Sequence, residues 1–319
     1  MRIFENTNID FLGKRKRFYL VSLTVIIIGM ITLFMKGIPL GIDFQGGTEL
    51  QLSFQNNIDV GQLRDIMQNA GFEGMEIKTM GTDTDILLRT PQQGEGQAVA
   101  EGIQNAIKSG LPGNQFEVLR IDKVGPKIGA ELRRNALFAI VFSLIGILVY
   151  LSLRFQFIYA IGAVAALLHD VLITISMIAI CNALIPGLRL EFDQPMLAAF
   201  LTLIGFSVND TVVIFDRIRE NIRLFKHEEI ETVMNKSVNA TLSRTIITSG
   251  TVFLTVLVLF IFGGEVLRGF AFTFLIGIIT GTYSSIFVAS AVVVDWKHRL
   301  DTSAAIKKDR KKANLSTAK

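Results

Sequence analysis

A carboxylate stands inside an otherwise apolar run, in the segment Gly-Phe-Ser-Val-Asn-Asp-Thr from Gly205 to Thr211. A charged group at the centre of a membrane helix costs about 2.5–3.5 kcal/mol on insertion scales, so Asp210 should face a partner or a wet cavity. Asn209 and Gly205 share a small and polar stripe beside it at helical spacing, and Gly205 would let another helix approach closely. The pattern predicts an ion-coupling site; the alternative is an ion pair that only fixes helix packing.

Arg244 is the expected partner of Asp210. It stands at the expected start of the next apolar run, and Thr248, Thr251 and Thr255 continue a hydroxyl stripe from it along one helix face. Burial favours the neutral acid and a nearby guanidinium favours the carboxylate, so movement of the arginine could load and release a proton. The alternative is that Arg244 only extends its charged head to the membrane interface.

Two further ionisable residues, His169 and Asp170, lie near the middle of the third apolar run. Adjacent helix residues point about 100° apart, so the two side chains should not face one target. Asp170 is the better candidate for a contact in the ion pathway. His169 is as readily explained as a hydrogen-bonded packing residue.

Glycines mark two structural motifs. One is a helix-packing face of small residues four apart in the last apolar run, and the other is the segment Gly-Ile-Asp-Phe-Gln-Gly-Gly that follows the first run. Its paired glycines permit a tight turn with positive φ, and it lacks the spacing of a phosphate-binding loop, which excludes nucleotide binding. The residues of these motifs are Gly41, Asp43, Gly46, Gly47, Gly277 and Gly281.

Composition places the chain in a membrane. Half of the 319 residues are hydrophobic, 19% are charged, and the mean hydropathy is +0.47, more than one soluble core would bury. The net charge is +4, but the basic residues cluster where membrane topology signals belong, so nucleic-acid binding is not expected. One cysteine and three histidines offer neither a disulfide nor a metal cluster, so we expect no cofactor and no enzyme activity.

Six apolar runs have the length of a membrane-spanning helix, which is about 20 residues. They cover 18–35, about 135–153, 157–183, 194–215, 245–262 and 266–294. With both termini in the cytoplasm, the basic residues fall on the inner side, as the positive-inside rule expects. The first run has the charge order of a signal peptide, but its length favours an uncleaved anchor.

The long segment between the first two runs is expected to be a soluble domain outside the membrane. Its alternating and helical patterns follow the order β-α-β-β-α-β, which predicts a ferredoxin-like α+β fold. The predicted organisation is an N-terminus with the first helix at 1–35, a periplasmic domain at 36–134, helices two to six at 135–296, and a basic cytoplasmic tail at 297–319.

Five motifs resemble the SecD/SecF translocase subunits of the resistance-nodulation-division superfamily. They are GIDFQGG at 41–47, VGPKIGAEL at 124–132, HDV at 169–171, FSVNDTVVIFDRIREN at 206–221 and LSRTIITSGT at 242–251. The resemblance implies a bacterial inner-membrane protein that pairs with SecD, associates with the SecYEG channel and YajC, and uses the proton motive force to draw preprotein out of the channel. It implies that Asp210 and Arg244 take part in proton movement, although some relatives use sodium.

Two other functions fit the same features. A passive scaffold would stabilise SecD or the channel, with the intramembrane charges specifying only helix packing. A small-molecule exporter of the same superfamily is the third hypothesis, and the short outer segment argues against it because such pumps carry two large outer domains per chain.

Overall fold

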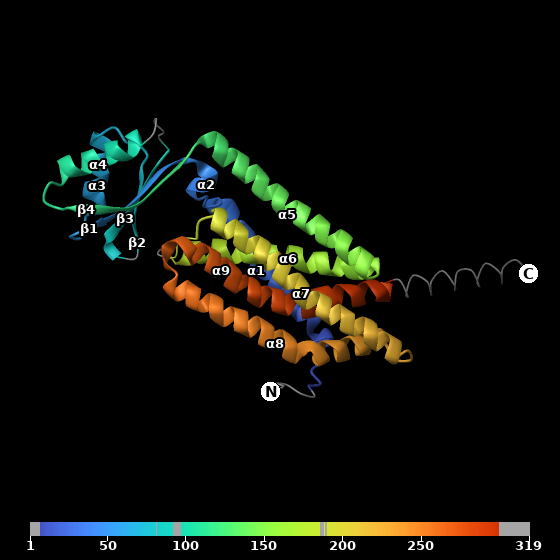
Figure 1. Ribbon diagram of the computed structural model, residues 1–319. Coiled ribbons are helices and arrows are strands. Elements are labelled where there is room, and N and C mark those ends of the chain that lie inside the picture. Colours follow the sequence, from blue (N-terminus) through green and yellow to red (C-terminus); the bar gives the residue numbers. More distant parts are fainter. Residues whose placement is uncertain (1–6, 81, 92–96, 186–187, 189, 300–319) are drawn as a thin grey trace, which may run out of the picture. The chain divides into compact units, whose positions relative to one another are not determined.

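The computed structural model describes residues 7–80, 82–91, 97–185, 188 and 190–299 (Figure 1). These residues form two compact units. The described parts of 1–37, 139–184 and 198–319 form a helical unit, and those of 38–138 and 185–197 form an outer unit. The part of the predicted basic tail (297–319) that follows residue 299 lies outside the described residues.

Six helices of the described chain are long and apolar enough to cross a membrane, which confirms the predicted class of polytopic helical membrane protein. They are α1 (Arg15–Lys36), α5 (Pro126–Arg154), α6 (Phe157–Leu184), α7 (Gln194–Leu224), α8 (Ile230–Phe262) and α9 (Gly264–Ser284). After α9 the helix continues through a π-helical turn, Ser285–Ala289, to residue 299. A short 3-10 turn, Leu12–Lys14, precedes α1.

Two of these helices begin earlier than the hydropathy pattern predicts. The second begins at Pro126 and not near 135, and the fifth begins at Ile230 and not at 245. Proline is well suited to the first position of a helix, since its missing N–H would have no partner there. Hydropathy detects only the apolar stretch of a helix, so the polar first turns of α5 and α8 escaped prediction.

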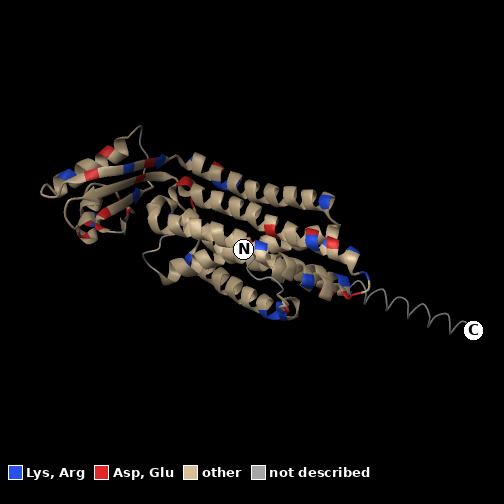
Figure 2. Cartoon of the chain, turned by 60° about the horizontal axis from the view of Figure 1, so that its bottom comes forward, with Lys and Arg blue, Asp and Glu red and all other residues tan. Residues whose placement is uncertain are grey.

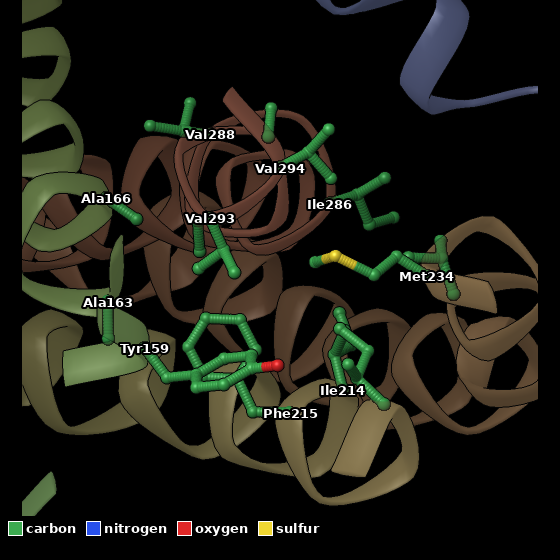
Figure 3. Close-up of a cluster of buried hydrophobic side chains, with 14 of the residues drawn as sticks. Tyr159, Ala163, Ala166, Ile214, Phe215, Met234, Ile286, Val288, Val293 and Val294 are labelled. Atoms are coloured by element: carbon green, nitrogen blue, oxygen red, sulfur yellow. The ribbon is translucent and has the colours of Figure 1, made fainter. Parts of the chain in front are cut away.

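Buried aromatic and aliphatic side chains build the core of the helical unit. Figure 3 shows them interlocking between α6, α7, α8 and the helix that follows α9. Labelled members are Tyr159, Ala163, Ala166, Ile214, Phe215, Met234, Ile286, Val288, Val293 and Val294. In contrast, α1 and α5 leave most of their apolar side chains exposed, as suits contact with lipid or with a partner helix.

Helix α1 packs on α6 through Gly29. A Cβ added to Gly29 would lie 2.2 Å from Ser176 Cβ and 2.4 Å from its Cα, so Gly29→Ala should cost about 1–3 kcal/mol of stability through overpacking. Thermal unfolding of the detergent-solubilised chain measures the loss. Gly146→Ala on α5 is the matched control, because nothing lies within 4 Å of its added Cβ. Equal melting temperatures for the two variants would contradict this packing.

The outer unit has the predicted ferredoxin-like fold. Its four strands form an antiparallel sheet in the order β2-β3-β1-β4, with two helices between them in sequence. The elements are β1 (Gly47–Phe54), α3 (Val60–Asn69), β2 (Glu76–Met80), β3 (Thr82–Thr90), α4 (Ala98–Gly110) and β4 (Phe116–Val124). Asp59 caps α3 by accepting a hydrogen bond from the Gly61 N–H at 2.8 Å. Apolar residues of β1 and β3, such as Leu50, Leu52 and Leu88, pack with α3 and α4 in one core.

The segment between α6 and α7 also belongs to the outer unit. Leu40 and Phe192 form a parallel bridge, in which the Phe192 N–H donates to Pro39 O at 2.6 Å and the Gly41 N–H donates to Phe192 O at 2.8 Å. The Phe192 ring lies 5.9 Å from the ring of Phe44, which belongs to the short helix α2 (Ile42–Gln45). The hydropathy pattern does not predict this contribution, since it treats the segment only as a loop.

Candidate functional site

Asp210 is buried at the middle of α7. Its side chain is 4% exposed, and Ser249 Oγ on α8 donates a hydrogen bond to Asp210 Oδ2 at 3.1 Å. Thr241, Thr245 and Ser249 follow one another at four-residue spacing on the buried face of α8. The buried Thr245 hydroxyl has no hydrogen-bond partner among the described residues. Among the described residues, Asp210 therefore has one hydroxyl, that of Ser249, as its hydrogen-bond partner and no ion pair.

Arg244 lies near Asp210 without pairing with it. The two interact electrostatically, but the exposed Arg244 side chain makes no hydrogen bond or ion pair within the described part of the chain. It lies in the middle of α8 and not at the start of the helix, because α8 extends back to Ile230. Thr248 is half-buried, and its carbonyl oxygen accepts a hydrogen bond from Thr251 Oγ1 at 2.9 Å. The hydroxyl of α8 that contacts Asp210 is therefore that of Ser249, which lies on the buried face of the helix, and not that of Thr248.

One face of α7 is polar and uncovered. Thr202, Gly205 and Asn209 are all exposed, and nothing lies within 4 Å of a Cβ added to Gly205. The Asn209 amide makes no hydrogen bond within the described residues. An uncovered amide in a membrane helix is costly, so this face calls for a partner outside the chain.

Asp170 is a second buried carboxylate and has several hydrogen bonds. It lies on α6 and is 1% exposed. Ser207 Oγ on α7 and Ser284 Oγ on α9 both donate to Asp170 Oδ2, at 2.6 Å and 2.9 Å. Gly281 and Gly277 bring α9 close to α7, since a Cβ added to either would lie within 3.1 Å of a side-chain atom of α7.

His169 extends the hydrogen bonds of Asp170 toward α1. Its Nδ1 lies 3.0 Å from Asp170 Oδ1, so the two neighbours contact each other, although their spacing suggested different targets. Its Nε2 lies 2.8 Å from Ser22 Oγ and 3.1 Å from the Tyr283 hydroxyl. Four helices, α1, α6, α7 and α9, thus contribute to one hydrogen-bonded network.

A single turn of α7 connects the two carboxylates. Ser207 binds Asp170, and Asp210, one turn further along, binds Ser249. Any rotation or shift of α7 would therefore change the surroundings of both carboxylates. Among the residues described, no three His, Cys, Asp or Glu side chains come together as metal ligands.

The glycine motif after α1 has the positive φ angles that were predicted, 79° at Gly46 and 128° at Gly47. A Cβ on Gly47 would lie 2.5 Å from the Thr90 carbonyl oxygen, so a side chain there would block the entry into β1. Asp43 Oδ2 accepts a hydrogen bond from the Gln194 N–H at 2.9 Å, and Gly41 lies against Asp193. The motif therefore joins the sheet to the first turn of α7, the helix that carries Asp210.

The family described as "Protein export membrane protein SecD/SecF, C-terminal" matches residues 104–299. The chain belongs to the SecD/SecF family. The description "SecD/SecF GG Motif" matches residues 31–58, which contain the glycine motif. This membership, the six apolar helices and the relatives below make the chain a multi-pass membrane subunit of the protein translocase.

The relatives of this SecD/SecF chain are similar over nearly its whole length. The protein translocase subunit SecF of Rhodothermus marinus is 46% identical over 94% of this chain and 96% of its own, and that of Calditerrivibrio nitroreducens is 44% identical over 91% and 95%. The crystal structure of SecDF, a translocon-associated membrane protein from Thermus thermophilus, matches with a TM-score of 0.81 at 36% identity. The match covers 92% of this chain but only 39% of that longer chain.

Several hydroxyl residues of the site were missed in the sequence. Ser22, Ser207, Ser249 and Ser284 look ordinary one by one because serine is frequent in membrane helices. A usable signal was present at Thr241, Thr245 and Ser249, whose four-residue spacing marks a polar face on α8 distinct from that of Thr248. Ser207 could have been found from its position, because it lies one helical turn before Asp210.

Replacing Asp170 separates its packing role from its charge. Asp170→Asn keeps an oxygen acceptor for Ser207 and Ser284, whereas Asp170→Ala leaves these buried hydroxyls without it and should cost about 2 kcal/mol more stability. Thermal unfolding of the two variants in detergent tests this difference. If Asp170→Asn also retains ion coupling, the residue serves packing; if the two variants unfold alike, the hydrogen bonds do not stabilise the bundle.

Asp193, the residue before α7, gives the outer unit a pH dependence. Burial, with a smaller contribution from the carboxylates of Asp43 and Glu191, raises its pKa to about 6, and the hydrogen bond from the Met196 N–H opposes the shift. Because the folded chain holds this proton more tightly, the stabilisation is full below pH 3.8 and is lost as the pH rises through 6. Asp193→Asn keeps the helix cap but does not titrate, so it should remove this pH dependence of the stability. Thermal unfolding between pH 4 and pH 7 measures the difference. Asp193→Ala should in addition lose about 1 kcal/mol at every pH, because the cap is gone.

Proposed function

We propose that this chain is the ion-coupling subunit that works with SecD to promote preprotein export, driven by the proton motive force. The observation that carries the proposal is Asp210, a carboxylate buried in a membrane helix and contacted by one hydroxyl, beside an arginine that does not pair with it. Intramembrane carboxylates with so few fixed contacts are typical of proton and ion pathways. Structural ion pairs, by contrast, are held by close contacts on both sides.

The proposed mechanism is a shift between two arrangements of α7. A proton on Asp210 removes its charge and weakens its attraction to Arg244, so α7 and α8 can repack; loss of the proton reverses the change. Helix α7 begins in the segment that binds the glycine motif and the outer sheet, and Asp210 lies further along the same helix. A movement of α7 is therefore the proposed route by which ion binding reaches the outer domain.

The uncovered polar face of α7 supports SecD as the partner. Thr202, Gly205 and Asn209 offer a close-approach surface with an unpartnered amide, and Arg244 is exposed on the neighbouring α8. A helix of SecD on this face would cover the amide and complete the ion pathway with its own polar groups. The SecYEG channel, YajC and the translocating preprotein are the further partners that we propose from the family.

We propose that the chain lies in the bacterial inner membrane with both termini in the cytoplasm and 36–134 in the periplasm. In the helical unit the Lys and Arg residues gather toward helix ends, while the helix middles are mostly uncharged (Figure 2). The start of α1 and the end of α7 each carry a basic cluster, and α5 ends at Arg154; the positive-inside rule assigns these residues to the cytoplasm. The work proposed for the chain is conformational and involves no covalent chemistry of its own.

The test is ion uptake and preprotein export by the complex with SecD in sealed vesicles. An imposed proton gradient should drive uptake and increase export over vesicles that lack the complex, and a sodium gradient of equal size should not. Drive by sodium alone would keep the coupling role but replace the ion. No ion-dependent export with an assembled complex would reject the proposal.

A passive scaffold is the second candidate, and the Asp170 network favours it. That carboxylate is held by groups from three elements of the bundle, as a residue that fixes helix packing would be. A scaffold predicts that variants of Asp210 and Asp170 fail only when the complex with SecD dissociates. Pull-down of SecD with each variant separates this outcome from a loss of coupling.

A further inference from the structure

A basic cavity of about 520 Å³ opens where α5 ends, α6 begins and the last helix ends beside the final turns of α7. Four cationic side chains line it, from α5, α7 and the last helix, and no acidic residue is among the described residues that line it. They are Arg154, Arg219, Arg223 and Lys297. All of the lining residues belong to the helical unit.

Most of this positive charge is uncompensated. Arg219, Arg223 and Lys297 make no ion pair with any residue described in the structure. Only Arg154 is paired, with Asp216 at 3.0 Å, and both side chains of that pair are 43% exposed. The nearby carboxylates of Asp216 and Glu220 are paired with Arg154 and Arg217. Three cations around one cavity repel each other, so an anion in the cavity would relieve this repulsion.

The inner wall of the cavity is aromatic. Tyr159 is only 6% exposed, its ring lies edge-on to the Phe215 ring at 5.1 Å, and its position in the buried cluster is visible in Figure 3. The Tyr159 hydroxyl makes no hydrogen bond within the described residues, although a buried phenol usually finds a partner. Tyr159 thus lines the cavity together with the cations and brings a hydroxyl that has no hydrogen-bond partner among the described residues.

Exposed apolar side chains surround the cavity. Leu153, which lines it, is 84% exposed, and Phe157, the first residue of α6, is 63% exposed. In a membrane protein such side chains face acyl chains. A ligand for this cavity therefore needs an anionic head for the basic groups and an apolar body that continues along the helices.

We propose that the cavity binds the phosphate headgroup of an anionic phospholipid, with Arg219, Arg223 and Lys297 as cationic ligands and the Tyr159 hydroxyl as a hydrogen-bond donor. Arginine suits this role because its guanidinium forms paired hydrogen bonds with phosphate oxygens. The assignment to the inner leaflet rests on the proposed orientation. A bound lipid here would lie at the end of α7, the helix that carries Asp210.

The test measures lipid bound to the full chain, in complex with SecD, by native mass spectrometry after reconstitution in mixed phosphatidylcholine and phosphatidylglycerol. Wild type should retain phosphatidylglycerol. The double variant Arg219→Gln/Arg223→Gln should retain less of it, by a factor of about ten or more. The control Arg133→Gln/Arg134→Gln removes two exposed charges from α5 outside the cavity and should retain lipid as wild type does. Equal losses in the two double variants would overturn the site.

Two additional measurements test the hydroxyl and the identity of the anion. Tyr159→Phe preserves the packed ring and should lower retention by a few fold, so unchanged retention would remove the hydroxyl from the site. Inorganic phosphate at millimolar concentration should not displace the lipid; full displacement would assign the cavity to a free phosphate and overturn the lipid proposal. Lipid retention is read without any ion gradient, so its outcome is independent of whether the chain couples ions.

Discussion

Asp210→Asn is expected to abolish ion-driven export while the complex with SecD stays assembled. Asparagine has nearly the same shape and keeps an oxygen that accepts the hydrogen bond from Ser249, so the contact between α7 and α8 should survive. It cannot take up or release a proton, so the charge beside Arg244 no longer changes. Proton uptake in sealed vesicles should fall to the background of vesicles without the chain.

Asp216→Asn is the matched control for this experiment. Asp216 lies on the same helix, six residues beyond Asp210, but its side chain is 43% exposed and pairs with Arg154 at the surface. An exposed ion pair contributes at most about 1 kcal/mol, so uptake and assembly should remain near wild type. Normal uptake by Asp210→Asn, or a complex that dissociates, would make this carboxylate structural and favour the scaffold.

Arg89→Met is expected to unfold the outer unit more readily than any other single change in its sheet. Arg89 on β3 is the centre of an ion-pair cluster: it binds Glu49 of β1 and Glu191 of the α6–α7 segment, both at 2.5 Å, and Glu76 of β2 at 3.3 Å. The Arg89 side chain is 10% exposed, and those of Glu49 and Glu191 are 15% and 16% exposed. Removing the cation leaves two mostly buried carboxylates facing each other, at a cost of about 3 kcal/mol.

The pKa shifts of this cluster give the variant a pH signature. Burial would lower the pKa of Arg89, but Glu191 and Glu49 outweigh it and raise that pKa. Burial would raise the pKa of Glu191, but Arg89 and Lys78 lower it, so Glu191 stabilises the fold above its ordinary pKa of 4.5 and loses that contribution as the pH falls. Burial already raises the pKa of Glu49, and Arg89 opposes that shift. Without Arg89 the buried carboxylates lose this cation, so protonation in acid should partly restore the stability of Arg89→Met.

Thermal unfolding and limited proteolysis of the full chain between pH 4 and pH 8 test both expectations. The matched control is Arg120→Met on β4, whose 46% exposed side chain pairs with Asp122 in the same sheet and should matter little. Adding Glu49→Gln and Glu191→Gln to Arg89→Met should recover part of the loss, because the uncompensated charges are then gone. If Arg89→Met is no less stable than Arg120→Met, the cluster does not hold the segment to the sheet.

The sequence predicted the order of strands and helices in the outer unit, and it predicted the bounds of the membrane helices less completely. Asp59 and the amphipathic run after it locate α3 at 60–69 because a cap and a period are local properties. The starts of α5 and α8 were missed because a hydropathy profile detects only the apolar part of a helix and gives no signal for its polar turns. The helix α8 is therefore longer than its apolar run, and Arg244 lies in its interior.

The burial of Asp210 could be predicted, but its partner could not. A lone carboxylate in an apolar run must be sheltered, and the structure shows it at 4% exposure. Which face of α8 meets it depends on the rotation of the helix, which is set by packing against α7 and α9. The same holds for Asp170, whose hydrogen bonds come from residues far apart in the chain, such as Ser207 and Ser284.

The outer unit has consequences for the construction of chimeras. Glu191, which binds Arg89 of the sheet, and Phe192, which bridges to Leu40, come from a stretch of chain far beyond the end of β4. A graft that exchanged only the contiguous stretch 38–125 would place the donor's residue at position 89 against the host's own segment around Glu191. If the two do not match, an arginine at position 89 would lose that carboxylate partner. Residues 185–197 therefore have to be transplanted together with the domain, and two stretches separated in sequence should change as one unit in evolution.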